Sequence, residues 1–237
     1  DGVSASIGIS KACNPYGDVL IAYEMNDAPM PRDHGYPLRV VVPGYAAIRN
    51  VKWVQRIELA TTEAEGAWQR GLNYKTLPPA VKDAKGLNLE ELPSMMEGSI
   101  FSGITKTYIP SAPYSEKPGT LIPVTVSGWA WAGGGRNIVR VDVSGDEGKT
   151  WKSARLKEGA HQRYGKAWAW TFWECETEAV VNEDGDVELV SKAVDMAFNS
   201  QPESARHGWN VRGLGNNSWY RKKRIRILPL CSSIFGR

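Results

Sequence analysis

The segments "IPVTVSGWAWAGGG" (residues 122–135) and "NIVRVDVSGDEGKTWKSARL" (residues 137–156) carry the clearest pattern in this 237-residue chain. Valine, isoleucine and tryptophan fall on every second position, which is the period of a strand with one buried face. Turn signals rich in glycine separate the apolar runs. The two segments therefore predict antiparallel strands. No helix pattern follows the glycine run 131–136, so we expect a hairpin turn there rather than a phosphate-binding loop.

The same alternation recurs downstream, in residues 165–178, 186–199 and 219–228. Several short strands separated by turns favour an antiparallel β-sandwich of the immunoglobulin type. Cys175 falls within one of these strands, but no second cysteine stands at the distance that an inter-sheet disulfide needs. We therefore expect a sandwich that is held together by its apolar core alone.

A basic run, "YRKKRIRI" (residues 220–227), forms most of the last predicted strand. It has two interpretations: a nucleic-acid-binding patch, or an exposed edge strand whose charges oppose aggregation. The alternation of Lys223 and Ile225 with Arg224 and Arg226 favours the edge strand. The formal net charge of +3 is too small to indicate a nucleic-acid partner, and we expect none.

The composition is that of an ordinary globular protein, with 42% hydrophobic and 23% charged residues. No apolar run reaches the roughly 18 residues that a membrane-spanning helix needs, so we expect no membrane insertion. Three distant cysteines, Cys13, Cys175 and Cys231, fit neither a disulfide framework nor a zinc site. The first residue is Asp1, so we expect any targeting signal to lie upstream of it.

The patterns before residue 100 are weaker. Apolar runs predict strands at residues 18–26, 37–44 and 51–61. Residues 62–72 show a weakly helical pattern, and residues 73–98 are interpreted as a surface linker.

Basic side chains gather around two of these strands, in "PRDHGYPLR" (residues 31–39) and "RVVVPGYAAIRNVKWVQRIEL" (residues 39–59). His34 and Arg39 flank a Gly-Tyr-Pro turn, and Lys52 follows in the next loop. An imidazole, a guanidinium and an ammonium group at strand ends would form a cradle for a phosphate. The alternative interpretation is three unconnected surface residues.

Two further side chains are candidates for contact with a substrate. Tyr23 ends an apolar strand, where it is either a functional tyrosine or a core or rim residue. Arg212 lies in "WNVRGLGNNSWYR" (residues 209–221), a glycine-containing loop between tryptophans. It would serve as an oxyanion ligand, or alternatively pair with a carboxylate or stack on an indole ring.

Six motifs together resemble the sulfite oxidase family of molybdenum-cofactor enzymes, in the family's order and from about residue 4 to residue 227. They are "LIAYEMND", "PRDHGYPLRVVVPGY", "RNVKWVQRI", "GWAWAGGGRNIVRVDVSGDEGKTW", "GKAWAWTFW" and "WNVRGLGNNSWYR". The resemblance implies that the cofactor, a molybdenum-molybdopterin ending in a phosphate, contacts the residues His34, Arg39, Asn50, Val51 and Lys52. Asn50 stands where many members of the family have histidine, and we expect weaker charge complementarity there.

The resemblance also implies catalytic roles for Tyr23, as a tyrosine that hydrogen-bonds substrate or an equatorial oxo ligand, and for Arg212, as an arginine of the anion pocket. Related assimilatory nitrate reductases typically carry methionine at the position of Arg212. Arg212 and the Glu24-Met25-Asn26 turn therefore favour sulfite as the substrate.

For the whole protein, the resemblance implies oxidation of sulfite to sulfate. Residues 1–95 would be the end of a mixed α+β molybdopterin-binding domain, and residues 96–237 an immunoglobulin-like dimerisation domain. The expected fold class is therefore mainly β. The family further implies a homodimer, an electron acceptor such as cytochrome c or oxygen, and the mitochondrial intermembrane space.

The family's molybdenum-ligating cysteine, and its haem domain where one exists, lie upstream of the Tyr23 strand. We therefore expect no metal ligand in this chain, an ordinary thiol at Cys13, and no activity of this chain alone. Two alternatives remain open: a molybdoenzyme of the nitrate reductase type, and a non-catalytic structural subunit that retains the fold.

Overall fold

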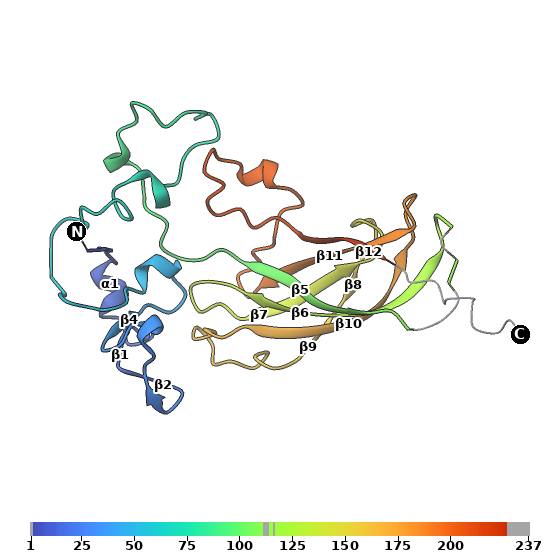
Figure 1. Ribbon diagram of the computed structural model, residues 1–237, viewed down its shortest axis with the longest axis horizontal. Helices are drawn as coiled ribbons and strands as arrows, with labels where there is room; N and C mark the ends of the chain where they lie inside the picture. Colours follow the sequence, from blue (N-terminus) through green and yellow to red (C-terminus); the bar gives the residue numbers. More distant parts are fainter. Residues whose placement is uncertain (1, 111–113, 116, 227–237) are drawn as a thin grey trace, which may run out of the picture.

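The computed structural model describes residues 2–110, 114–115 and 117–226 (Figure 1). Two antiparallel sheets pack face to face at one end of the molecule. Short strands, single turns of 3-10 helix and irregular segments form the other end. The expected fold class, mainly β, is confirmed. Among the described residues, no helix is both long and apolar enough to cross a membrane.

In the described part of the chain, the sandwich contains two sheets of four strands each. The first sheet has, in spatial order, β5 (Phe101–Tyr108), β6 (Leu121–Trp131), β10 (Thr171–Val180) and β9 (Arg155–Leu156). The second sheet has β12 (Tyr220–Arg226), β11 (Asp186–Asp195), β7 (Ile138–Ser144) and β8 (Lys152–Ser153). The strands predicted from alternation form, although β10 begins only at Thr171. Residues 227–228 of the last predicted strand lie outside the described residues.

The core lies between the two sheets. Along β6, every second side chain points inward, so Ile122, Val124 and Val126 are buried. Trp173 on β10 is 1% exposed and packs beneath Gly128, where a Cβ would overlap its indole ring. The alternation in sequence therefore marks the face of each strand that is removed from water.

The glycine run 131–136 is not a hairpin turn, contrary to our expectation. It joins β6 of the first sheet to β7 of the second, so the chain crosses the sandwich there. Turn-forming glycines also allow close backbone approach, and Gly133 packs directly on Gly98, to whose carbonyl its N–H donates at 3.1 Å. The run thus fastens the sandwich to the segment that enters it.

Among the described residues, the basic strand β12 pairs only with β11 and is therefore an edge strand, as predicted. Its ladder shifts register between Val187 and Leu189, and Arg224 there has a φ of 57°. A bulge of this kind disturbs the free edge and opposes further pairing. Of the cysteines, Cys175 is buried and free and Cys13 is exposed and free, whereas Cys231 lies outside the described residues.

The irregular end differs more from expectation. It contains α1 (Ile9–Ala12), β1 (Leu20–Ala22), β2 (Glu24–Met25), β3 (Ala28–Pro29), β4 (Arg39–Val41), η1 (Arg32–His34), η2 (Ala47–Arg49), η3 (Leu72–Tyr74) and η4 (Leu89–Glu91). Strand β1 pairs with β4, and β2 with β3. The strand predicted at residues 18–26 is therefore split in two. The predicted strand at residues 51–61 does not form, because Trp53 adopts a φ of 54° that ends the extended run.

Two other predictions for this end were wrong. Residues 62–72 form turns instead of a helix, and they include Gly66 and Gly71, which weaken helix formation. Residues 73–98 are not a simple surface linker, because Lys75 is 1% exposed and Leu77 is 6% exposed. The boundary between residues 95 and 96 stays a prediction, although β5 starts shortly after it.

The two ends are joined by direct contacts. Asp18 accepts hydrogen bonds from Lys166 and from the indole N–H of Trp168, the latter at 2.7 Å. The Lys166 ammonium and the Trp168 indole therefore hold the pKa of the Asp18 carboxyl below its ordinary value. Arg136 bridges Glu97 and the buried Asp195. These contacts fix the irregular end on the sandwich.

Candidate anion-binding site

The carbonyl groups of the 3-10 turn η1 accept hydrogen bonds from cationic side chains of two other segments. Lys52 donates from its Nζ to the carbonyl of Asp33 at 2.7 Å. Arg39, the first residue of β4, donates from its Nη1 to the carbonyl of His34 at 3.0 Å. Three of the predicted residues, His34, Arg39 and Lys52, therefore lie around one turn and are not unconnected. We call the group made by η1, Arg39 and Lys52 the anion turn.

Gly35 makes this close approach possible. Its φ is 122°, a conformation that residues with a side chain rarely adopt. A Cβ at this position would lie 2.9 Å from the Cβ of Arg39 and 3.1 Å from the Cβ of Lys52. Any larger residue would therefore push the two cationic side chains apart.

Trp53 completes the support of the turn. Its indole Nε1 donates to the carbonyl of Arg32 at 3.0 Å, and the ammonium of Lys52 lies 4.7 Å from the centre of its ring. A cation over an aromatic face is stabilised without being neutralised. The Asp33 carbonyl and the Trp53 ring thus hold the ammonium of Lys52 in a fixed place.

Asn50 and Val51 contribute mainly through the backbone. The carbonyl of Val51 accepts from the N–H of Val40 at 2.8 Å, which holds residues 50–52 alongside β4. The side chain of Asn50 is turned inward: its Oδ1 accepts from the N–H of Val42 at 2.7 Å, and its Nδ2 donates to the carbonyl of Ala46 at 3.4 Å. The side chain of Asn50 therefore positions the loop that carries Lys52.

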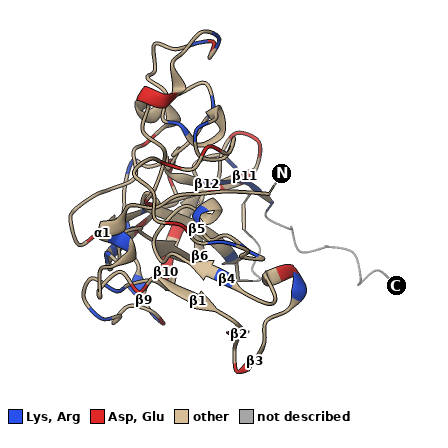
Figure 2. Cartoon of the chain, turned by 90° about the vertical axis from the view of Figure 1, so that its left-hand side faces the viewer, with Lys and Arg blue, Asp and Glu red and all other residues tan. Residues whose placement is uncertain are grey.

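The anion turn fits an anionic group. The Nε of Arg39 is buried and has no hydrogen-bond partner among the described residues, which is costly unless a ligand accepts from it. Arg32 and His34 add to the basic character, and Asp33 supplies the one acidic side chain of the turn. Figure 2 looks onto this end of the molecule and shows a basic position on β4 beside the loops that surround it. Oxyanions such as phosphate suit this set of donors.

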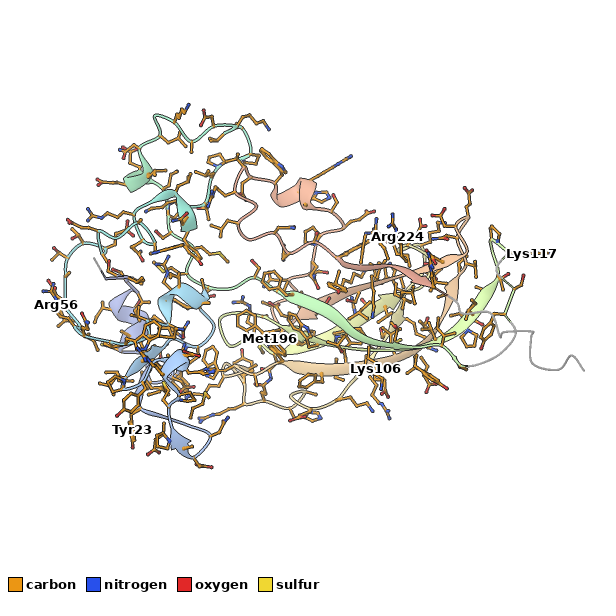
Figure 3. All side chains as sticks on the ribbon, viewed as in Figure 1. Tyr23, Arg56, Lys106, Lys117, Met196 and Arg224 are labelled. Atoms are coloured by element: carbon orange, nitrogen blue, oxygen red, sulfur yellow. The ribbon has the colours of Figure 1, made fainter. Side chains whose placement is uncertain are left out.

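The structure does not place Tyr23 and Arg212 at the same point. Tyr23 is 64% exposed, between β1 and β2, and is labelled at the lower left of Figure 3. It is therefore not a core residue. Its carbonyl accepts from the N–H of Met30 at 3.2 Å, so its backbone is held although its side chain is free to meet a ligand.

Arg212 lies in the loop that follows η5 (Ala205–Gly208), on the opposite side of Figure 1 from the β2–β3 hairpin. Its Nη2 donates to the Oδ1 of Asn73 at 3.2 Å. Among the described residues it pairs with no carboxylate and stacks on no ring. Its charge is therefore oriented by an amide but not neutralised. No group of three or more metal-ligating side chains occurs in the described part of the chain.

Comparisons with known proteins agree with this arrangement. Residues 1–68 match the model of the oxidoreductase molybdopterin binding domain, and residues 114–227 match the Mo-co oxidoreductase dimerisation domain. The chain is 42% identical over 228 residues to mitochondrial sulfite oxidase of Mus musculus, which covers 95% of this chain and 39% of the relative. The chain belongs to the sulfite oxidase family.

Other members of the family are similarly close. Sulfite oxidase of Gallus gallus is 42% identical over 92% of this chain and 45% of its own length. Nitrate reductase of Hordeum vulgare is 39% identical over 92% of this chain and 25% of its own length. The chain thus spans less than half the length of these relatives.

A solved relative has the same fold. The sulfane dehydrogenase SoxCD from Paracoccus pantotrophus has a TM-score of 0.64 and 27% sequence identity, over 94% of this chain and 54% of that one. The sequence resemblance to the sulfite oxidase family is therefore confirmed.

Sequence reasoning missed the buried residues behind the anion turn. Arg49 belongs to the basic loop, but it is 2% exposed and donates to the carbonyl of Met95 instead of facing an external anion. Gln69 and Lys75 are buried beside it. A buried polar residue must be hydrogen-bonded. The segment has no apolar periodicity, so the sequence holds no signal that these residues are buried.

Proposed function

We propose that this chain is the C-terminal part of a sulfite oxidase, which oxidises sulfite to sulfate with a molybdenum-molybdopterin cofactor. The observation that carries the proposal is the convergence of His34, Arg39 and Lys52 on one turn, in a chain 42% identical to a sulfite oxidase. Nitrate is disfavoured as the substrate because the guanidinium of Arg212 suits a compact sulfur oxyanion.

The anion turn would hold the phosphate end of the cofactor. Arg39 offers its unpartnered Nε and Lys52 offers its ammonium, and both donors already lie on the turn that Gly35 permits. His34 lies at the end of η1, where its ring can add a third donor. When bound, the cofactor supplies the two-electron oxidation, and the protein supplies binding and orientation.

Arg212 and Tyr23 would act on the substrate. A guanidinium can bind two oxygens of sulfite at once, which fixes the orientation of the anion and offsets its charge. The phenol of Tyr23 can donate a hydrogen bond to a further oxygen. The bond between Arg212 and Asn73 would orient the guanidinium before the substrate arrives, which lowers the entropic cost of binding.

The assembly follows from the same proposal. Residues 1–95 would complete the molybdopterin-binding domain, and residues 96–237 would mediate a homodimer. The match to a dimerisation domain supports this role for the sandwich. Mitochondrial relatives support a mitochondrial location, within which we propose the intermembrane space. The electron acceptor would be cytochrome c or oxygen, and a haem domain, where the whole protein has one, would lie upstream.

The test uses the intact enzyme that contains this chain. Changing Arg212→Met removes one charge-assisted contact, so kcat/KM for sulfite should fall by about one to two decades, or roughly 1.5–3 kcal/mol. Arg212→Lys keeps the charge but not the planar fork and should recover part of the loss. Bound molybdenum should not change. Arg206→Met, an exposed arginine of η5, is the matched control.

Normal sulfite kinetics in Arg212→Met would contradict the role of Arg212. Nitrate turnover exceeding sulfite turnover in the wild-type enzyme would instead identify a nitrate reductase. Loss of molybdenum in Arg212→Met would mean that the loop holds the cofactor domain and not the substrate.

A further inference from the structure

A buried polar network lies directly behind the anion turn. Arg49 at the end of η2 donates from its Nη2 to the carbonyl of Met95 at 3.0 Å, and from its Nη1 to the Oε1 of Gln69. Gln69 is 0% exposed and Arg49 is 2% exposed. Burial lowers the pKa of the Arg49 guanidinium, and the nearby carboxylate of Glu63 opposes this shift. These contacts compensate a charge that is expensive to bury.

Glu63 and Lys75 extend the network. Gln69 donates from its Nε2 to Glu63 at 2.7 Å, and Lys75 donates from its Nζ to Glu63 at 2.9 Å. Lys75 also donates to the carbonyl of Leu92 at 2.9 Å. Burial raises the pKa of Glu63, but its hydrogen bonds outweigh this effect, and the pKa lies below its ordinary value. The network therefore contains an ionised carboxylate between two cations.

On one side, the network reaches the anion turn. Arg49 immediately precedes residues 50–52, and the N–H of Ala46 just before η2 donates to the carbonyl of Met96 at 2.7 Å. Both ends of η2 are thereby tied to the segment that contains Met95 and Met96. The place of Lys52 depends on how this short helix is held.

On the other side, the network reaches Arg212. The guanidinium of Arg49 lies 5.8 Å from the ring centre of Tyr74, and the N–H of Met95 donates to the carbonyl of Tyr74 at 2.8 Å. Asn73 precedes Tyr74 in η3 and accepts the hydrogen bond from Arg212. A continuous set of contacts thus runs from the anion turn through Arg49 to Arg212.

We propose that Arg49 is a positioning residue that couples the anion turn to the loop of Arg212. This proposal rests on the proposed function for the roles of the two sites, whereas the coupling between them is a property of this chain. Arg49 touches neither ligand. Arg49 directly precedes residues 50–52, and its buried guanidinium contacts Met95 and the ring of Tyr74. Tyr74 follows Asn73, which holds Arg212, so a shift at one site changes the other through Arg49.

Hydrogen–deuterium exchange of the full 237-residue chain tests the coupling. One group of reporters consists of the N–H groups of Val40, Val42 and Val54, which bond to the anion-turn segments. A second group consists of the N–H groups of Arg212 and Leu214, which bond to the Oδ1 of Asn210. The ladder between β6 and β10 reports on the sandwich.

In Arg49→Met, both reporter groups should exchange about tenfold faster, because the carbonyl of Met95 and the Oε1 of Gln69 lose the hydrogen bonds that Arg49 donates. The ladder between β6 and β10 should not change. Arg70→Met is the matched control, since Arg70 lies in the same region and, among the described residues, forms only long ion pairs, with Glu65 and Glu90 at 3.7 Å. It should accelerate neither group by more than about twofold.

Two milder variants keep the test decisive if Arg49→Met unfolds. Arg49→Lys retains the charge and one bond, and both reporter groups should exchange about threefold faster. Asn73→Ala removes only the hydrogen bond between Asn73 and Arg212, so exchange should become faster in the Arg212 group alone. Acceleration of the anion-turn group without the Arg212 group in Arg49→Lys would overturn the proposal, as would no change in either.

The outcome separates this inference from the proposed function. Failure of the wild-type chain to bind inorganic pyrophosphate would contradict the anion turn itself, while the exchange pattern would still decide the coupling. Pyrophosphate binding that is unchanged in Arg49→Lys, together with unchanged exchange, would overturn the coupling and leave the anion turn in place.

Discussion

The sandwich and the irregular end of this chain are stabilised by different interactions. In the sandwich, β6 and β10 pair along ten consecutive positions, and the space between the sheets is filled by apolar side chains. At the irregular end, the longest strands have three residues, and buried side chains include Arg49, Gln69 and Lys75. There, bonds from side chains to backbone carbonyls replace the ladders of a sheet.

This difference suits the two tasks. Apolar burial is non-directional and gives the sandwich a stable surface for association. Hydrogen bonds are directional, so the polar network can hold the loops that carry Lys52 and Arg212 in fixed orientations, as the proposed function requires. Such a network depends on each of its members, because a buried polar group that loses its partner is costly. The irregular end should therefore be the more fragile of the two.

The largest effect should come from the sandwich core. Trp173→Ala removes an indole that is 1% exposed and should lower the free energy of unfolding by about 3–5 kcal/mol. Trp170, which is 51% exposed and stacks on Trp129, provides the control. Trp170→Ala should cost about 1 kcal/mol. Urea unfolding followed by circular dichroism measures both, and equal losses would contradict the assignment of the core.

An intermediate effect is expected at the irregular end. Lys75→Met removes the ammonium that bonds to Glu63 and to the carbonyl of Leu92. Because Glu63 is partly exposed, we expect a loss of about 2 kcal/mol rather than the full cost for a buried pair. Limited proteolysis should cleave residues 60–98 faster while the sandwich stays intact. Cleavage of the irregular end and the sandwich at the same rate would show that the two ends do not differ in stability.

The smallest effects concern the stability of the chain at acidic pH. Glu63 has a depressed pKa, so its stabilisation is present above its ordinary value of 4.5 and is lost as the pH falls through the lower folded value. In the sandwich, burial raises the pKa of Asp146, but the hydrogen bonds from Thr150 and Ser144 outweigh this effect. The pKa of Asp146 is therefore lowered from 3.8 to about 2. Its contribution should therefore persist to lower pH.

For Asp146, we expect a contribution of about 1 kcal/mol after screening by solvent, lost between pH 3.8 and about 2. Asp146→Asn should remove this part of the acid dependence. Acid titration of the wild-type chain and the variant, with the tryptophan fluorescence as readout, measures the difference. Identical titrations would show that the turn around Asp146 adds nothing to stability.

The sequence predicted the sandwich well because one physical rule governs it. Residues such as Val124, Val126 and Trp173 alternate with exposed neighbours, and that period directly reports the buried face. The glycine run 131–136 was misread because glycine serves both tight turns and close packing, and only the fold shows which one applies.

The anion turn was predictable in part. The types and spacing of His34, Arg39 and Lys52 indicated an anion site, and the turn brings them together. The partner of Arg49 was not predictable, because it is a backbone carbonyl 46 positions away in a segment without periodicity. The inward turn of Asn50 likewise depends on its contact with the N–H of Val42.

The central claim is that Arg39 and Lys52 present an anion-binding surface on η1. Titration of the 237-residue chain with inorganic pyrophosphate, followed by calorimetry, tests it most directly. The wild type should bind, and Lys52→Met should weaken binding about tenfold or more, because it removes a charge-assisted donor. Lys106→Met, an exposed lysine of β5 labelled in Figure 3, should bind as the wild type does. Equal affinities for Lys52→Met and Lys106→Met would contradict the account.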